Sequence, residues 1–190
     1  MTARARAAFL DRDGTLIDEL EFLRQPADLR LLPGAAEGVR VLCEGGYKTV
    51  VVTNQSGIAR GLLDEVTLAE IHGRLRHELE RAGARLDAIL YCPHHPDYGP
   101  AAYRRTCECR KPAPGLVLRA ARELELDLPR SWMIGDSLRD LECARAAGLA
   151  GSVLVLTGKW RAELLDAPPG ERLRTAPDLL AAANWLVQGK

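Results

Sequence analysis

Short apolar runs alternate along the chain with longer segments in which apolar residues recur every three or four positions. The short runs predict buried strands, and the recurring spacing predicts amphipathic helices that cover them. We expect strands at residues 6–10, 49–53, 88–91, 132–134 and 153–156, and helices at residues 33–44, 64–82, 114–126, 137–147 and from 177 onwards. No such pattern runs from 158 to 176, where the Ala-Pro-Pro-Gly sequence at 167–170 predicts a surface loop.

Local signals support these elements and indicate how they are arranged. Asp64 is a good N-cap for the second helix, and Gly83 is well placed to end it. Residues 49–53 are all β-branched, which is typical of a strand covered on both faces. Because strands separated by helices favour right-handed crossovers, we expect an α/β fold with a doubly wound, Rossmann-like parallel sheet.

Polar side chains follow three of the predicted strands. Asp11 and Asp13 come after the first, Thr53 and Asn54 end the second, and Asp136 follows the fourth. Ligands of doubly wound sheets bind beyond the carboxyl ends of the strands. We therefore expect these residues to converge on one site.

Asp11 and Asp13 are the most informative pair. Residues two apart on an extended chain point to the same side, and Gly14 lets the chain turn away directly afterwards. Two carboxylates this close need a cation or a shared proton. The pair favours a divalent metal site with one nucleophilic carboxylate and one proton carrier. An acidic turn without chemistry is the alternative, because Asp and Gly are common turn residues.

Two other segments carry groups that suit a phosphate. Residues 53–57 offer a hydroxyl, side-chain amides and a glycine turn, and the alternative is a cap on the following segment. Arg110 and Lys111 lie in a stretch that Pro112 and Pro114 make rigid. A lysine held in this way can act as a point charge on a phosphoryl group. Two solvated cations are the usual alternative, and the paired prolines argue against it.

A second pair of carboxylates follows the fourth strand. If Ser137 starts the next helix, Asp136 and Asp140 lie within one turn of each other. Asp136 can then complete an oxygen-rich magnesium site with Asp11. Asp140 has a structural alternative, because acids in the first turn also complement the helix dipole.

Three cysteines and a histidine gather in one segment, the cysteine–histidine loop (residues 92–109). Cys92, His94, Cys107 and Cys109 form a Cys₃His set in two closely spaced pairs, the composition of a closed structural zinc site. The alternatives are reduced buried cysteines or a regulatory disulfide, and His95 could replace His94 as the ligand. Cys43 and Cys143 lie in predicted helices, where we expect them to be packing residues.

Composition narrows the class of protein. The chain has 190 residues, of which 47% are hydrophobic, so we expect one domain over residues 1–190. Its formal net charge of +0 does not support a nucleic-acid partner, and no apolar stretch reaches the roughly 20 residues of a membrane helix. The N-terminal residues run straight into the first strand, so we expect no signal peptide. We therefore expect a cytoplasmic monomer with neither nucleic-acid nor membrane partners.

The segments that begin at Asp11, Thr53, Arg110 and Asp136 resemble, in order, the four motifs of the haloacid dehalogenase-like phosphatases. The resemblance implies that Asp11 attacks phosphorus and forms an aspartyl-phosphate, while Asp13 acts as general acid and then as general base. It also implies phosphoryl binding by Thr53 and Lys111, and Mg²⁺ held by the Asp11 and Asp136 carboxylates and the Asp13 carbonyl. Asp140 would support the metal or Lys111.

The cysteine–histidine loop and residues 51–61 narrow the resemblance to the D-glycero-D-manno-heptose-1,7-bisphosphate 7-phosphatases. It implies a small sugar phosphate as substrate, with Arg110 and Gln55 contacting it. Histidinol phosphate, or another small ester, is the alternative, since histidinol-phosphatase domains share the zinc loop. A zinc-stabilised scaffold without activity is the alternative from a different class, and the presence of both Asp11 and Asp13 argues against it.

The chain departs from that family at two places beside the expected site. Residues 18–23, here called the flap segment, stand where relatives often carry a Gly-Tyr-Val-like sequence, and Ser137 stands where a basic residue is common. Little sequence separates the first two motifs, so we expect no cap domain. The cysteine–histidine loop would then form part of the wall of an open site.

Overall fold

Six parallel strands form one sheet in the computed structural model, which describes residues 4–158 and 173–189. The spatial order is β3-β2-β1-β4-β5-β6, so the chain winds from β1 towards one edge and then returns past β1 to the other. This confirms the predicted doubly wound sheet. The strands are β1 (Ala7–Leu10), β2 (Lys48–Asn54), β3 (Ala88–Cys92), β4 (Trp132–Gly135), β5 (Gly151–Val155) and β6 (Leu173–Ala176).

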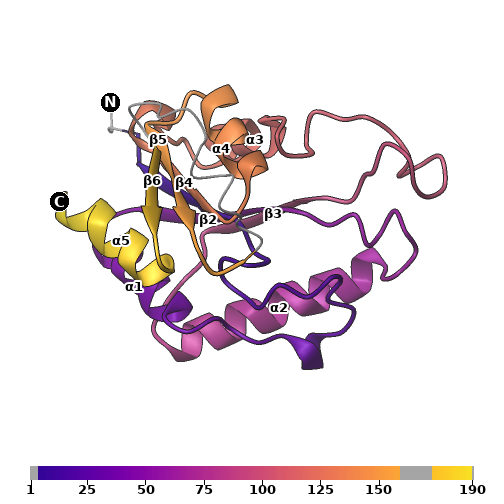
Figure 1. The fold of residues 1–190 in the computed structure, drawn as a ribbon, viewed down its shortest axis with the longest axis horizontal. Helices are drawn as coiled ribbons and strands as arrows, with labels where there is room; N and C mark the ends of the chain where they lie inside the picture. The colour runs from indigo at the N-terminus through magenta and orange to yellow at the C-terminus, as the bar shows by residue number, and fades with distance from the viewer. Residues whose placement is uncertain (1–3, 159–172, 190) are drawn as a thin grey trace.

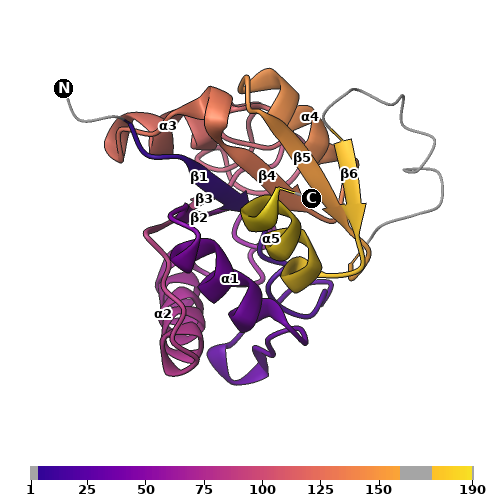
Figure 2. The ribbon, with the colours of Figure 1, turned by 90° about the vertical axis from the view of Figure 1, so that its left-hand side faces the viewer.

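Helices cover both faces of the sheet (Figures 1 and 2). One face packs on α1, α2 and α5, and the other packs on α3 and α4. Alternate residues of β1 point into the two cores, with Leu10 on the first face and Phe9 on the second. The helices are α1 (Ala35–Glu44), α2 (Glu65–Arg81), α3 (Gly115–Glu123), α4 (Leu138–Ala146) and α5 (Leu179–Gln188), with 3₁₀ turns at Pro26–Asp28 and Leu128–Arg130.

The helix boundaries follow their local chemistry. The Asp64 carboxylate accepts a hydrogen bond from the Thr67 N–H at 2.7 Å, so the predicted N-cap of α2 is confirmed. The third helix was expected to reach residue 126 but ends at Glu123, because Glu125 adopts a left-handed conformation with φ of 52°. None of the helices in the described part of the chain is long and apolar enough to cross a membrane.

β6 corrects the prediction that residues 158–176 carry no strand. It pairs with β5 from Leu173 to Ala176 at the edge of the sheet, and its middle residues Arg174 and Thr175 are exposed. An edge strand of four residues with polar side chains lacks both an apolar run and a clear alternation, so periodicity does not reveal it. The surface loop predicted at 167–170 lies outside the described residues.

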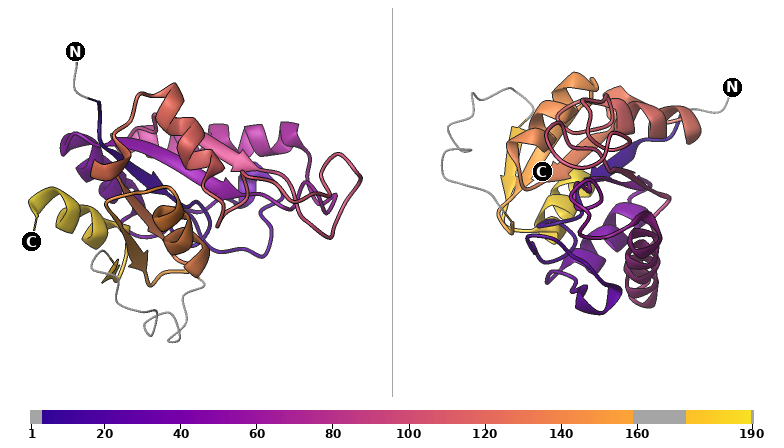
Figure 3. Two further views of the ribbon diagram at one scale, coloured as in Figure 1. Left: turned by 90° about the horizontal axis from the view of Figure 1, so that it is seen from above. Right: turned by 90° about the vertical axis from the view of Figure 1, so that its right-hand side faces the viewer.

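The register of the sheet brings the functional segments together. Leu10, the last residue of β1, lies opposite Val51 of β2 and Ile134 of β4. The segments that follow β1, β2 and β4 therefore leave the sheet side by side. The cysteine–histidine loop extends beyond the same carboxyl ends of the strands, as Figure 1 and the left panel of Figure 3 show.

Candidate phosphoryl-transfer and metal sites

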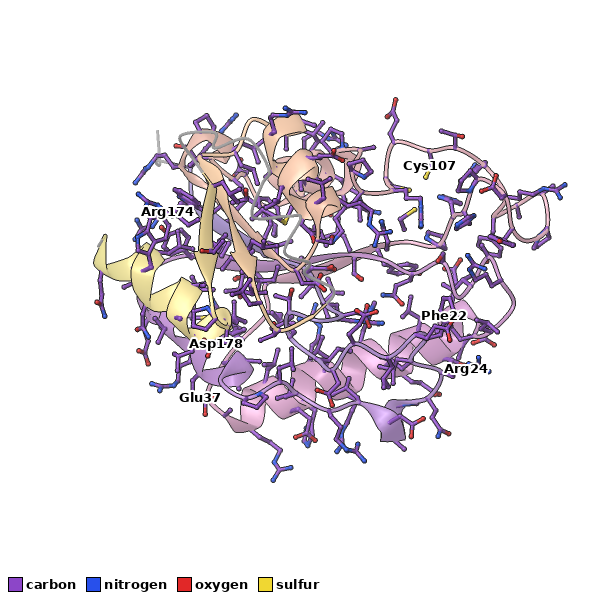
Figure 4. All side chains as sticks on the ribbon, in the orientation of Figure 1. Phe22, Arg24, Glu37, Cys107, Arg174 and Asp178 are labelled. Carbon is purple, nitrogen blue, oxygen red and sulfur yellow. The ribbon has the colours of Figure 1, made fainter. Side chains whose placement is uncertain are left out.

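A cavity of about 370 Å³ opens beyond the carboxyl ends of β1, β2 and β4. His95 of the cysteine–histidine loop lines it, so the predicted contribution of that loop to the wall is confirmed at this residue, and the flap segment lines it with residues 19–23. Figure 4 labels Phe22 of the flap segment and Cys107 of the loop, which lie on this side of the molecule. The polar and charged lining residues are Asp11, Arg12, Asp13, Glu19, Glu21, Thr53, Asn54, Gln55, Ser56, Arg60, His95, Arg110, Lys111, Asp136, Ser137 and Arg139.

Asp11 and Asp13 have separate sets of partners. The N–H of Asp11 donates to the Ile134 carbonyl at 2.9 Å, which fixes the end of β1 against β4. The Asp11 carboxylate lies 2.8 Å from the Lys111 ammonium. Both oxygens of Asp13 instead accept hydrogen bonds from the Arg12 guanidinium, at 2.8 and 3.1 Å. The two acids are neighbours in sequence but differ in electrostatic environment, as two groups with different chemical roles require.

Three carboxylates and one ammonium group form the centre of the site. Asp11, Asp136 and Asp140 each offer an oxygen within 4.8 Å of the other two. Lys111 Nζ is 2.6 Å from Asp140 Oδ1 and is almost completely buried. Burial lowers the pKa of Lys111, but the Asp11 and Asp140 carboxylates outweigh it and raise the pKa above its ordinary value. Lys111 is therefore a fixed positive charge that links the two acids.

The carboxylate of Asp11 is unusually easy to protonate. Its pKa is raised from 3.8 to about 7, chiefly by burial, and the negative charges of Asp140, Asp136 and Asp13 act in the same direction. Lys111 opposes this shift but does not cancel it. A cation placed among these acids would relieve the repulsion and keep Asp11 ionised.

Glycine is required where the chain turns after Asp13. Gly14 has φ of 77°, and a Cβ atom there would lie 2.5 Å from Asp136 Oδ2. Gly158 also packs against the Asp136 carboxylate closely enough to exclude a side chain. Two glycines from distant segments thus let the backbone close around Asp136, which is almost completely buried.

The donor set fits Mg²⁺. Hard divalent cations bind carboxylate and carbonyl oxygens, and Asp11 and Asp136 supply two such carboxylates within reach of one ion. Asp140 is close enough to contribute, yet both of its oxygens already have partners. Oδ1 contacts Lys111, while Oδ2 accepts hydrogen bonds from the Ser137 N–H and hydroxyl at 3.2 and 2.6 Å. Its primary contact is therefore with Lys111 and the start of α4.

The end of β2 and the residue after it hold Lys111 and Asp13 in place. Asn54 forms two 3.0 Å hydrogen bonds with the main chain of Lys111, one as donor and one as acceptor. Gln55 donates to Asp13 Oδ2 at 2.9 Å and to Thr53 Oγ1 at 2.8 Å. Thr53, Asn54 and Gln55 all line the cavity, but the amides of Asn54 and Gln55 contact Lys111 and Asp13.

Three arginines line the cavity together with Glu19 and Glu21 of the flap segment. Arg60, Arg110 and Arg139 form no ion pair among the described residues, whereas Arg12 and Lys111 each pair with a carboxylate. Burial lowers the pKa of Arg110, and the nearby Arg139 and Arg60 cations act in the same direction. Arg60 stacks 3.8 Å from the centre of the exposed Tyr98 ring, which joins the β2 turn to the cysteine–histidine loop.

The Cys₃His residues converge in the cysteine–histidine loop, and yellow sulfur atoms gather beside Cys107 in Figure 4. The Sγ atoms of Cys92, Cys107 and Cys109 lie 3.2–3.5 Å apart, and His94 Nδ1 is 3.3 Å from Cys109 Sγ. Burial raises the pKa of Cys92 and of Cys109. Four soft and borderline donors at such distances fit a closed, tetrahedral zinc site. The cluster lies apart from the carboxylates, so it fits a structural metal.

The structure also separates the two candidate histidines. His94 belongs to the cluster, whereas the His95 ring packs on Tyr98 and lines the cavity. Arg105 Nη2 lies 2.7 Å from His94 Nε2, which must accept because a guanidinium only donates. A metal on Nδ1 would place the proton of the neutral ring on Nε2. Arg105 would then have to move away when the metal binds.

Sequence reasoning missed several residues of the cavity. Arg12, His72, Arg60 and Arg139 were not identified as functional residues, yet three of them line the cavity and His72 contacts Arg12. For Arg12, its position between Asp11 and Asp13 was a signal in the sequence that could have marked it as a residue of the site. No sequence pattern relates His72 to residues that lie 60 positions earlier.

Two family models match the chain. The model described as polynucleotide kinase 3 phosphatase matches residues 6–142, and the model described as HAD-hydrolase-like matches residues 108–182. Together they span the four motifs. They agree with the superfamily that the sequence resembles.

Individual proteins are also similar over most of the chain. The D-glycero-beta-D-manno-heptose-1,7-bisphosphate 7-phosphatase of Photorhabdus laumondii is 44% identical over 84% of this chain and 85% of its own length. The protein of the same name from Bordetella bronchiseptica is 41% identical over 94% and 96%. A crystal structure of the D,D-heptose 1,7-bisphosphate phosphatase from B. bronchiseptica, complexed with magnesium and phosphate, matches with a TM-score of 0.87 and 38% identity, covering 97% of this chain and 99% of that one.

Proposed function

The chain belongs to the D-glycero-beta-D-manno-heptose-1,7-bisphosphate 7-phosphatase family of haloacid dehalogenase-like phosphatases, and we propose that it removes the 7-phosphate of D-glycero-D-manno-heptose 1,7-bisphosphate. The observation that carries this proposal is the contact of 2.8 Å between Asp11 and Lys111, set between Asp136 and Asp140 at the strand ends. A nucleophilic carboxylate, a fixed cation and a metal-binding oxygen set are the parts that phosphoryl transfer needs.

Asp11 is the proposed nucleophile. An oxygen of its carboxylate attacks phosphorus in line with the bond to the C7 oxygen, and that bond breaks as an aspartyl-phosphate forms. Lys111 offsets the charge of the equatorial phosphoryl oxygens, and the Thr53 hydroxyl, which lines the cavity, is the proposed donor to them. Asn54 supports the step indirectly, because its amide fixes the main chain of Lys111.

Asp13 is the proposed proton carrier. It protonates the C7 oxygen as that oxygen leaves with the electron pair of the broken bond. In the second half of the reaction it takes a proton from the water that attacks phosphorus, and the bond from phosphorus to Asp11 breaks. Inorganic phosphate is released and the carboxylate of Asp11 is restored.

We propose that Asp11, Asp136 and the main-chain carbonyl of Asp13 hold Mg²⁺, with Asp140 in a supporting position through Lys111. Bound magnesium would neutralise developing charge on the phosphoryl group and keep Asp11 ionised. The related structure complexed with magnesium and phosphate supports this assignment. The proposed metal in the Cys92, His94, Cys107 and Cys109 cluster is a structural Zn²⁺.

Three further arginines of the cavity favour a substrate with a second phosphate. Lys111 and Arg12 are occupied by carboxylates, whereas Arg60, Arg110 and Arg139 line the same cavity and form no ion pair among the described residues. A phosphate at the far end of a short sugar would meet these guanidinium groups. Arg110 is the proposed main contact, because a hydrogen bond of 3.1 Å to the His94 carbonyl fixes its direction.

The test is phosphate release with Mg²⁺ from both anomers of heptose 1,7-bisphosphate, compared with histidinol phosphate, fructose 1,6-bisphosphate and an oligonucleotide that ends in a 3′-phosphate. We expect the highest kcat/KM for one heptose anomer. A preference for histidinol phosphate or the oligonucleotide would keep the chemistry and replace the substrate. An absence of release from every ester would favour a binding scaffold without activity.

We further propose one phosphatase domain over residues 1–190, acting as a cytoplasmic monomer. The named relatives are bacterial proteins whose substrate is a small sugar phosphate, which suits a cytoplasmic enzyme. Light scattering coupled to size-exclusion chromatography tests the monomer directly. A mass of twice 20.8 kDa would contradict it.

A further inference from the structure

A buried arginine lies directly between the two functional acids. Arg12 is 1% exposed, and its guanidinium is surrounded by polar side chains. Nε and Nη2 donate to the two oxygens of Asp13, at 3.1 and 2.8 Å. Nη2 also donates to Gln55 Oε1 at 2.9 Å. A side chain with this many fixed partners cannot turn outwards to meet a ligand, so its function concerns Asp13.

Arg12 and Gln55 together determine where the Asp13 carboxylate points. Oδ2 accepts from Arg12, from Gln55 Nε2 at 2.9 Å and from the Thr53 hydroxyl at 3.5 Å, while the partner of Oδ1 among the described residues is Arg12. A bidentate contact with a guanidinium fixes the plane of a carboxylate as well as its position. Asp13 is 20% exposed towards the cavity and therefore reaches the substrate from a fixed direction.

The last partner of Arg12 comes from α2. His72 is buried, and its Nε2 lies 3.3 Å from Arg12 Nη1. Because a guanidinium only donates, Nε2 accepts and the ring proton is on Nδ1. Burial lowers the pKa of His72 to about 3, and the Arg12 and Arg76 cations also lower it. The negative charge of Asp13 acts in the opposite direction but does not cancel the shift. His72 is therefore a neutral acceptor, and it also packs against the Tyr91 ring.

A neutral acceptor suits this position better than a carboxylate. A second acid beside Arg12 would compete with Asp13 for the guanidinium. An aliphatic side chain would leave a buried N–H of Arg12 without an acceptor, which is unfavourable, and the guanidinium would be free to tilt. Histidine satisfies the N–H and leaves Asp13 as the carboxylate that Arg12 binds.

We propose that His72 and Arg12 are positioning residues for Asp13. His72, on α2, fixes the guanidinium of Arg12, and this guanidinium fixes the carboxylate of Asp13. The inference rests on the proposed function, because it gives Asp13 the role of protonating the leaving oxygen. It extends the active site to a helix face that does not meet the substrate. Figure 1 shows α2 running beneath the sheet.

The consequence is a specific dependence on the leaving group. A sugar oxygen is strongly basic and needs a proton as it leaves, whereas 4-nitrophenolate leaves without one. A displaced Asp13 should therefore slow phosphoryl transfer from the sugar phosphate more than transfer from 4-nitrophenyl phosphate. A general loss of structure would slow both to the same extent.

The experiment measures kcat/KM for the heptose bisphosphate and for 4-nitrophenyl phosphate, because kcat/KM reports the first phosphoryl transfer. We expect His72→Leu to lower the ratio of the two values about 10- to 100-fold. His72→Gln should restore most of the ratio, since its side-chain oxygen can accept from Arg12. His77→Leu, at an exposed position on the same helix, is the matched control and should leave the ratio unchanged.

Arg12→Lys is the second variant, because one ammonium group cannot hold both oxygens of Asp13. It should lower the same ratio and keeps the proposal testable if His72→Leu does not fold. An unchanged ratio in the folded variants would overturn the proposal, as would equal losses on both substrates. If the wild-type protein releases phosphate from neither ester, the proposed function fails instead, and the two failures are thereby distinguished.

Discussion

The phosphoryl-transfer site and the Cys₃His cluster are both groups of four polar side chains, but they are built differently. In the first, Asp11 follows β1 and Asp136 follows the neighbouring β4, so the register of the sheet places these two carboxylates together before any metal binds. Lys111 reaches them from the segment that follows the cysteine–histidine loop. The residues of the second belong to one loop that extends beyond the sheet. The comparison teaches that the sheet positions the two carboxylates, whereas the order of the loop that contributes His95 to the cavity would depend on the proposed zinc.

The first prediction addresses the site on the sheet. Asp11→Asn should lower kcat about 10⁴- to 10⁶-fold, because an amide cannot form the aspartyl-phosphate. The fold should be kept, since the substitution removes a buried negative charge from among other acids. Phosphate release and circular dichroism measure the two effects. Asp97→Asn, at an exposed loop position, is the matched control. Retained activity in Asp11→Asn would refute the nucleophile assignment.

The second prediction addresses the loop. Cys107→Ser should reduce bound zinc and lower the melting temperature by about 5–10 °C, equivalent to about 2–3 kcal/mol. Phosphoryl transfer from 4-nitrophenyl phosphate should change less than KM for the sugar bisphosphate, because the loop reaches the cavity through His95 and supplies none of the proposed catalytic groups. Metal analysis, thermal melting and kinetics test this. Cys43→Ser, outside the cluster, should leave zinc unchanged. Equal zinc content in both variants would contradict the zinc assignment.

The third prediction uses the titration of Asp11. In the folded, metal-free protein the pKa of Asp11 is about 7, above its ordinary value of 3.8. Protonated Asp11 therefore contributes stability that is fully present below about pH 4 and is lost as the pH rises through about 7. Magnesium competes with this proton. Saturating Mg²⁺ should therefore stabilise the protein by about 1–3 kcal/mol more at about pH 8 than at about pH 6.

Thermal melts with and without Mg²⁺ across this range measure the effect. Asp11→Asn is the control, because the amide does not titrate and its response to magnesium should vary little with pH. A wild-type response that is equal at both ends of the range would show that the carboxylate of Asp11 does not bind the ion.

The smallest predicted effect concerns the contact that ties the cysteine–histidine loop to α2 and β3. Glu65, the first residue of α2, accepts hydrogen bonds from the Tyr91 and Tyr103 hydroxyls, at 2.7 and 2.8 Å. Glu65→Gln keeps one acceptor and should cost less than about 1 kcal/mol, while KM rises about twofold as the loop loosens. Glu70→Gln, exposed on the same helix, is the control. A KM that is the same in both variants would show that Glu65 does not restrain the loop.

Much of the fold and of the site could be predicted because the signals are local. Buried β-branched strands, the Asp64 cap and glycines after helices define the α/β order, and the rule of strand ends then groups Asp11, Thr53 and Asp136. β6 could not be predicted, because its pairing depends on the edge of β5 and not on its own apolar pattern.

Contacts between distant segments also lie beyond sequence reasoning. The contact between Arg12 and His72 joins the end of β1 to α2, and the stacking of Arg60 on Tyr98 joins the β2 turn to the cysteine–histidine loop. The choice of His94 over His95 depends on the direction in which two adjacent side chains point. Each of these features is set by tertiary packing, which residue spacing does not encode.

The most direct test follows heptose 1,7-bisphosphate and Mg²⁺ by phosphorus NMR, in parallel reactions with the wild-type protein and Asp11→Asn. The account predicts that the wild-type protein removes the signal of the 7-phosphate, retains that of the 1-phosphate and releases inorganic phosphate, while Asp11→Asn leaves both esters intact. Loss of the 1-phosphate, or equal turnover by the two proteins, would contradict it.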